Sequence, residues 1–133
     1  MATITEDYVS FEIAKLLKEK GFDETCYACY EYFSSSITMY SGWPFEYKGE
    51  PVYNSKDIII CPTLQMAMKW LREVYKILIL VEYDCPVFSS DIYKMDDIDK
   101  YGSAKHISPT FANCKNYEQA CESAIKYSLE NLI

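Results

Sequence analysis

Apolar residues recur at helical spacing in three separate segments, and this feature constrains the fold more than any other in the sequence. The spacing predicts helices over about Thr5–Lys20, over Leu64–Tyr75 and from Tyr117 to the C-terminus, each with one buried face. Thr63 and Asn116 stand where the N-caps of the second and third helices are expected. Such apolar faces need another layer of structure to cover them.

The first helix carries signals at both of its expected ends. Thr5 is placed as its N-cap, with Ile4 and Val9 as the apolar pair that packs across such a cap. Gly21 follows the last helical residue, where glycine adopts the left-handed conformation without steric cost. Phe22 is then expected to fold back onto the helix.

Runs rich in aromatic and β-branched residues fill the spaces between the helices. Thr25–Phe33 and Ile37–Tyr40 predict one hairpin, and Ile77–Tyr83 with Val87–Tyr93 predict a second. Ile77–Tyr83 is almost wholly apolar, so a central strand covered on both faces is expected there. The sequence therefore predicts an α+β fold in the order α-β-β-α-β-β-α, an antiparallel sheet of about four strands with three helices, as a single domain over residues 1–133.

A long loop rich in aromatic residues is expected over Ser41–Asp57. Loops beyond about 12–15 residues are uncommon in compact domains unless they are functional or disordered. Large, rigid aromatic side chains are typical of binding surfaces. The candidate binding surface comprises Trp43, Phe45, Tyr47 and Tyr53. The alternative is an added edge strand over Phe45–Lys48, with the aromatic side chains covering the sheet.

The net charge of −7 is concentrated in one segment. Six acidic residues and one basic residue lie between Glu82 and Asp99, which gives this segment −5 and leaves −2 for the rest of the chain. Direct nucleic-acid binding is disfavoured, because it needs clustered Lys and Arg. The acidic segment is interpreted as a solvated face, and the alternative is a surface for a basic partner or a mimic of a phosphate backbone.

Six cysteines are present, and we expect them as thiols. Cys26 and Cys29 have the C-x2-C spacing of a zinc or redox site, but they fall within the expected strand Thr25–Phe33. Positions three apart on a strand point to opposite faces, so the two sulfurs should diverge. A second ligand pair does not follow in the sequence. A metal site is therefore not predicted.

His106 is the one histidine of the chain and lies in a second expected loop, Met95–Cys114. A nucleophilic pair with Cys114 or Cys121 stays open, because such pairs meet in space, but neither cysteine has a nucleophile motif around it. A surface role for His106 is favoured. The same loop contains Asp97–Gly102, which matches the first half of a calcium loop but lacks the bidentate Glu that closes one. We predict no catalytic residue, no metal, no cofactor and no enzyme.

The start of the sequence and its hydropathy bear on where the protein works. Met1–Glu6 lacks the basic and apolar regions of a signal peptide. No apolar run reaches the ~18 residues that a membrane span needs. We therefore expect a cytoplasmic protein with no membrane partner.

Three stretches carry a resemblance to a known family. Ile4–Phe22, Pro62–Glu73 and Ala124–Ile133 resemble the opening, the middle helix and the ending of a family of small uncharacterised proteins of Bacteroides-group bacteria, their prophages and mobile elements. The likeness covers under half of the chain. It implies a cytoplasmic accessory protein of phage or mobile-element type, and it implies no activity, cofactor or catalytic residue.

These observations favour a non-enzymatic protein-binding module that contacts a host or phage protein through the aromatic loop. The alternative is a small-molecule or nucleotide-binding protein with a Tyr-lined pocket. A cysteine- or metal-dependent enzyme is a third hypothesis. Nothing in the sequence indicates an oligomeric state.

Overall fold

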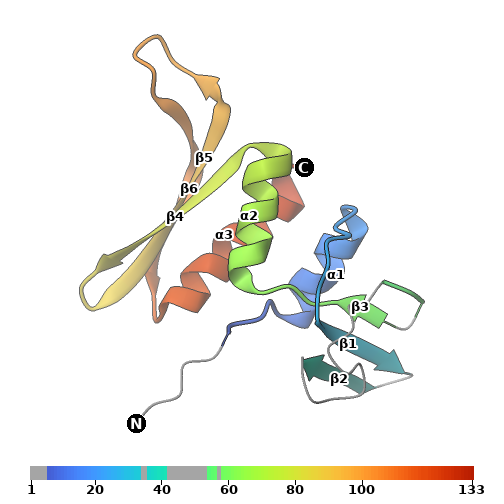
Figure 1. Cartoon of the computed structure of the whole chain (residues 1–133). Coiled ribbons are helices and arrows are strands. Elements are labelled where there is room, and N and C mark those ends of the chain that lie inside the picture. Colours follow the sequence, from blue (N-terminus) through green and yellow to red (C-terminus); the bar gives the residue numbers. More distant parts are fainter. Residues whose placement is uncertain (1–5, 34–35, 42–53, 57) are drawn as a thin grey trace. The chain divides into compact units, whose positions relative to one another are not determined.

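The structure is a computed structural model that describes residues 6–33, 36–41, 54–56 and 58–133. The described elements follow in the order α-β-β-β-α-β-β-β-α, which confirms the α+β class and the three helices (Figure 1). The expected single sheet of about four strands is wrong, because the described strands form two antiparallel sheets of three strands each. The chain divides into two compact units, Met1–Thr63 and Leu64–Ile133. That residues 1–133 form a single domain stays a prediction.

The first unit contains helix α1, Phe11–Glu19. Its N-cap is Ser10, whose hydroxyl accepts a hydrogen bond from the Ile13 N–H at 3.3 Å. The helix therefore begins six residues after Thr5, and the expected start at Thr5 is wrong. Ile4, which was expected to pack against Val9 across that cap, lies outside the described residues.

An extended segment takes the place of the missing helical turn. The N–H of Val9 donates to the Pro62 carbonyl at 3.1 Å, and Tyr8 forms an isolated antiparallel bridge with Thr63. The Val9 side chain is fully buried. These bonds satisfy backbone groups that a longer helix would have paired internally, so tertiary pairing overrides the local helical pattern.

The C-terminus of α1 follows the sequence expectation. Gly21 adopts a positive φ of 88°, and its N–H donates to the Lys18 carbonyl at 3.1 Å. The N–H of Phe22 donates to the Leu17 carbonyl at 2.9 Å. This pair of bonds is a Schellman motif, which satisfies the last carbonyls of the helix.

The first sheet has the order β2-β1-β3. β1 (Ala28–Phe33) pairs antiparallel with β2 (Ser36–Ser41), which confirms the first predicted hairpin. β3 (Ile58–Ile60) adds a strand that was not predicted; it pairs with the other edge of β1 and packs against α1.

The second unit runs α2-β4-β5-β6-α3, and its sheet has the order β4-β5-β6. The elements are α2 (Leu64–Tyr75), β4 (Ile77–Asp84), β5 (Val87–Ile98), β6 (Ala104–Cys114) and α3 (Tyr117–Asn131). α3 packs on all three strands, and α2 packs on β4 and on α3. Both helices and the hairpin β4–β5 agree with the prediction.

Apolar side chains and a buried hydrogen bond between β5 and α3 hold the second unit together. Its fully buried side chains include Leu71, Ile77, Ile92, Ile125 and Leu129. Ser90 on β5 is also fully buried, and its hydroxyl donates to the Ala120 carbonyl of α3 at 2.8 Å. This bond removes the penalty of an unpaired polar group in the core.

Two expectations for this unit are wrong. Ile77–Tyr83 was expected to be a central strand, but β4 is an edge strand, and Leu80 on it is 43% exposed. An apolar run alone does not distinguish a central strand from an edge strand with an apolar outer face. Met95–Cys114 was expected to be a loop, but it contains the end of β5 and the whole of β6.

Candidate functional site

The candidate binding residues from the aromatic loop, Trp43, Phe45, Tyr47 and Tyr53, lie outside the described residues. So does the alternative edge strand over Phe45–Lys48. The aromatic loop as a binding surface stays a prediction.

The second unit offers a different surface, a two-stranded arm. β4 pairs with β5 only as far as Lys94, whereas β5 continues to Ile98 and pairs there with β6 alone. We call residues 96–103 the β5–β6 arm, which is the orange ribbon that extends past β4 in Figure 1. Ile98 is 59% exposed and Tyr101 is 80% exposed. The arm therefore presents two large apolar side chains to solvent.

The tip of the arm is a turn organised by Asp99. Its carboxylate oxygen Oδ1 accepts hydrogen bonds from the N–H of Tyr101 at 2.8 Å and of Ser103 at 3.0 Å. Gly102 adopts a positive φ of 82° at this turn. The stretch that matches the first half of a calcium loop is thus a hairpin turn. In the described part of the chain, no three or more His, Cys, Asp or Glu side chains are arranged to hold a metal ion.

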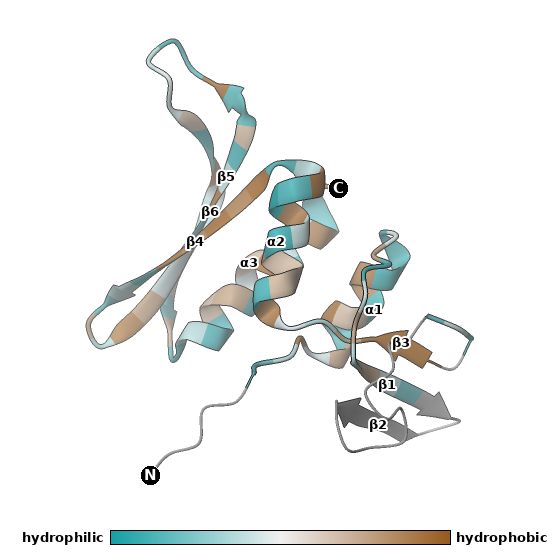
Figure 2. Ribbon diagram, in the orientation of Figure 1, coloured by the Kyte–Doolittle hydropathy of each residue, from teal (hydrophilic) through white to brown (hydrophobic). Residues whose placement is uncertain are grey.

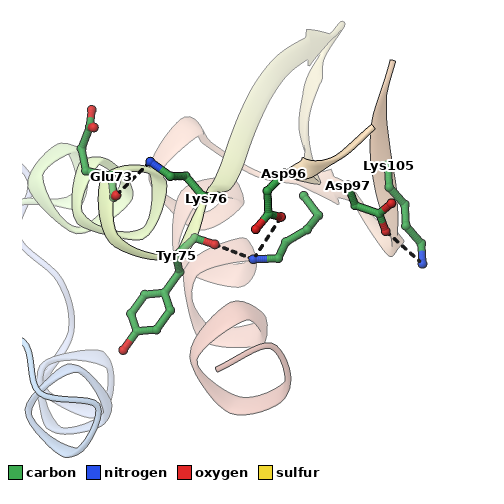
Figure 3. A network of polar contacts seen from close by, with 7 residues as sticks. Glu73, Tyr75, Lys76, Asp96, Asp97 and Lys105 are labelled. Atoms are coloured by element: carbon green, nitrogen blue, oxygen red, sulfur yellow. Dashed lines mark hydrogen bonds and ion pairs between the residues drawn. The ribbon is translucent and has the colours of Figure 1, made fainter. Parts of the chain in front are cut away.

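Lysine side chains neutralise part of the acidic segment at the base of the arm. Lys94 lies 3.6 Å from Asp96, and Lys105 lies 3.8 Å from Asp97 across the β5–β6 pair (Figure 3). The Lys94 ammonium also donates to the Tyr75 carbonyl at the end of α2, at 2.5 Å. A cation at a helix C-terminus complements the unpaired carbonyls there. These contacts favour a structural role for much of the acidic segment.

A polar cluster formed by Asp91, His106 and Thr110 joins β5 to β6. The Asp91 carboxylate accepts a hydrogen bond from the Thr110 hydroxyl at 2.6 Å and lies 2.9 Å from His106 Nε2. Donation by Thr110 and the contact with His106 outweigh burial and lower the pKa of Asp91. The Thr110 hydroxyl donates its hydrogen bond to the Asp91 carboxylate at 2.6 Å, and it lies farther from the imidazole, 3.4 Å from His106 Nε2. A nucleophile relay needs the reverse arrangement, so the cluster has the geometry of a cross-strand clamp.

The contacts of His106 and Cys114 lead to other residues rather than to each other. His106 is exposed, and its ring packs edge-to-face against Tyr93 at 5.3 Å between centroids. Cys114 is buried and its thiol donates to the carbonyls of Phe111 and Ala112. Cys121 is fully buried on α3.

The cysteines of the first unit are core residues, and Cys26 precedes β1 (Ala28–Phe33) instead of lying in the expected strand Thr25–Phe33. Cys26, Cys29 and Cys61 are all buried, and the Cys61 thiol donates to the Val9 carbonyl at 3.4 Å. Burial raises the pKa of Cys61 to about 12 and that of Cys26 to about 11. Thiols with such pKa values stay protonated at neutral pH and are therefore poor nucleophiles.

Comparisons with known proteins found no relative of this chain. A scan against protein-family models found no match, and searches of curated proteins and of solved structures found no similar protein. The family resemblance of the three helical stretches stays a prediction. Among the described helices, none has the length and apolar character required to cross a membrane.

Proposed function

We propose that the chain is a non-enzymatic protein-binding module whose partner is a host or phage protein. The observation that carries the proposal is the β5–β6 arm, which holds Ile98 and Tyr101 exposed at its end. A two-stranded ribbon is marginally stable by itself, and exposed large apolar side chains lower solubility. A partner that covers the arm would account for both features. The phage or mobile-element origin is inferred from the family resemblance alone.

The chemistry of the described side chains also favours binding over catalysis. The two thiols with raised pKa values are buried, and the Thr110 hydroxyl is engaged by a carboxylate. The arm combines the two exposed apolar side chains with Asp96 and Asp97, which are partly exposed and only partly neutralised by Lys94 and Lys105. A partner surface with basic residues around an apolar patch has the matching chemistry.

The experiment uses the full chain, immobilised and exposed to lysate of cells that carry its gene. Proteins that the wild type retains are purified, and their affinities are measured by calorimetry. We expect Ile98→Ser with Tyr101→Ser to weaken binding by at least about tenfold, since buried apolar anchors dominate interface energies. Trp43→Ala with Tyr47→Ala tests the aromatic loop in the same way.

Tyr27→Ser is the matched control, because Tyr27 is 50% exposed and lies outside both surfaces. Equal affinity of the wild type, the arm variant and the loop variant for every retained protein would contradict the proposal. A thermal-shift screen with nucleotides tests the alternative of a small-molecule ligand, because a ligand that binds only the folded state raises the unfolding midpoint.

A further inference from the structure

The two edges of the second sheet differ in how they are protected against pairing with another strand. β6 carries Pro109, which lacks an N–H, and its register with β5 is interrupted by shifts. β4 has neither proline nor charge over Ile77–Val81, and its register with β5 is continuous from Ile77 to Asp84. Figure 2 shows the first half of β4 as one apolar stretch. A regular apolar edge is a template for a further strand.

The hydrogen bonds of β4 determine which of its backbone groups face its open edge, the edge with which no described strand pairs. The Met95 N–H donates to the Lys76 carbonyl at 2.8 Å, so position 76 points toward β5. Antiparallel pairs alternate between hydrogen-bonded and non-hydrogen-bonded positions. Ile77, Ile79 and Val81 therefore direct their N–H and C=O groups away from β5, toward the open edge.

We propose that β4 pairs antiparallel with β4 of a second copy of this chain, about a two-fold axis at Ile79. In this register Ile77 lies opposite Val81 of the second copy, and Leu78 lies opposite Leu80. The outward N–H and C=O groups of Ile77, Ile79 and Val81 then bond those of the second copy, and Leu78 and Leu80 form the non-hydrogen-bonded pairs between them.

Charge complementarity selects this register. Lys76, the residue before β4, and Glu82 flank the apolar stretch, and pairing about Ile79 brings Lys76 of each copy next to Glu82 of the other. In the single chain Lys76 has a positive φ of 59° and its exposed ammonium donates to the Glu73 carbonyl at 3.4 Å, so the charge pair forms by a change of the lysine side chain. A shift of the axis to Leu80 would place Leu78 opposite Glu82, an apolar residue against a charge. Opposite charges across neighbouring strands stabilise a sheet, and like charges destabilise it. A two-fold interface requires such self-complementarity.

The pairing joins the two sheets into one with six strands and keeps their helices on the same side, because opposed residues share a face. It gives a partner to the edge beside Leu80, which is 43% exposed in the single chain. The proposal is separate from the proposed function, since it uses the edge of β4 and not the arm.

The dissociation constant of the dimer is measured by sedimentation equilibrium of the full chain from about 1 to about 200 µM. Variants that reverse the charge at position 76 or 82 test the register. We expect a dimer for the wild type and a roughly tenfold higher dissociation constant for Glu82→Lys or Lys76→Glu, because each creates two like-charge pairs. The double variant Lys76→Glu with Glu82→Lys restores opposite charges and should recover the wild-type constant. Glu19→Lys is the matched control, because Glu19 is exposed on α1.

Amide hydrogen exchange at both ends of the concentration range locates the interface, and far-UV circular dichroism verifies that each variant is folded. We expect the N–H groups of Ile77, Ile79 and Val81 to exchange more slowly at high concentration. A wild type that is monomeric at about 200 µM overturns the proposal. So does a dimer that Glu82→Lys leaves unchanged or that gives no protection to these three amides.

Discussion

At the scale of single residues, the Asp91 cluster makes folding stability depend on pH. In the folded state the Thr110 hydroxyl and, to a lesser extent, His106 lower the pKa of the Asp91 carboxyl, while burial opposes this shift. The stabilisation is therefore fully present above the pKa of Asp91 in the unfolded chain and is lost as the pH falls through its folded pKa. We expect Asp91→Asn to lower the free energy of unfolding by about 1–2 kcal/mol at pH 7.

Urea denaturation of the wild type and Asp91→Asn at several pH values measures this effect. The difference between the two should shrink below about pH 4, where Asp91 of the unfolded chain binds a proton while the folded carboxylate does so only at lower pH. Thr110→Val, which removes the largest cause of the shift, should show a similar loss at pH 7. A difference that is constant from pH 7 to pH 3 would show that the carboxylate charge is not the stabilising feature.

The six cysteines should differ sharply in reactivity. Cys85 is exposed in the β4–β5 turn, whereas the other five are buried. We expect one thiol to react within minutes with a disulfide reagent at pH 8 and the other five only after denaturation, because reaction needs an accessible thiolate. The Cys85→Ser variant should lose the fast phase, and Cys61→Ser should retain it. Fast reaction of a second thiol would contradict the burial of the other five cysteines.

At the scale of elements, local signals located the helices of the second unit. α2 begins and ends at the predicted residues, because its apolar stripe and its flanking residues lie within one stretch of sequence. For α3, the predicted cap is confirmed by the bond from the Gln119 N–H to the Asn116 side chain at 2.8 Å. α1 was predicted too long because its N-terminal residues bond to a segment more than fifty residues away, which local patterns do not reveal.

The strand β6 and the candidate site could not be predicted, because both depend on strand pairing that is not visible in the sequence. β6 contains Pro109 and mostly exposed residues, so neither alternation nor propensity marked it as a strand. Because β6 was missed, the contact between Asp91 and His106 across β5–β6 could not be predicted. The exposure of Ile98 and Tyr101 could not be predicted either, because it depends on where β4 stops pairing with β5.

The cap of α3 gives a prediction at this scale. Asn116→Ala removes the acceptor for the Gln119 N–H and should lower the free energy of unfolding by about 1 kcal/mol. Asn131→Ala, at the other end of the helix, is the control, because its side chain is exposed and donates to the Tyr127 carbonyl at 3.1 Å. Denaturant midpoints compare the two, and equal losses would contradict a specific contribution of the cap.

At the scale of the whole molecule, the division into two units predicts that the second can fold alone. The sheet β4-β5-β6 and the helices α2 and α3 are contiguous in sequence, and every strand pairing of that sheet lies within residues 64–133. A chain of this length is near the lower limit for a single core, yet domains of about 55–65 residues do fold alone. The buried bond from Ser90 to α3 links two layers of this unit directly.

We therefore expect the fragment 64–133 to unfold cooperatively in urea, with a far-UV spectrum typical of mixed helix and sheet. The slope of its unfolding free energy against urea should be smaller than that of the full chain, since the slope grows with the surface exposed on unfolding. Ser90→Ala in the fragment should lower its midpoint, because the change removes the hydroxyl donor to the Ala120 carbonyl. A fragment that gains structure only when fragment 1–63 is added would show that the two units share one cooperative core, and the chain would then behave as the single domain that its length suggests.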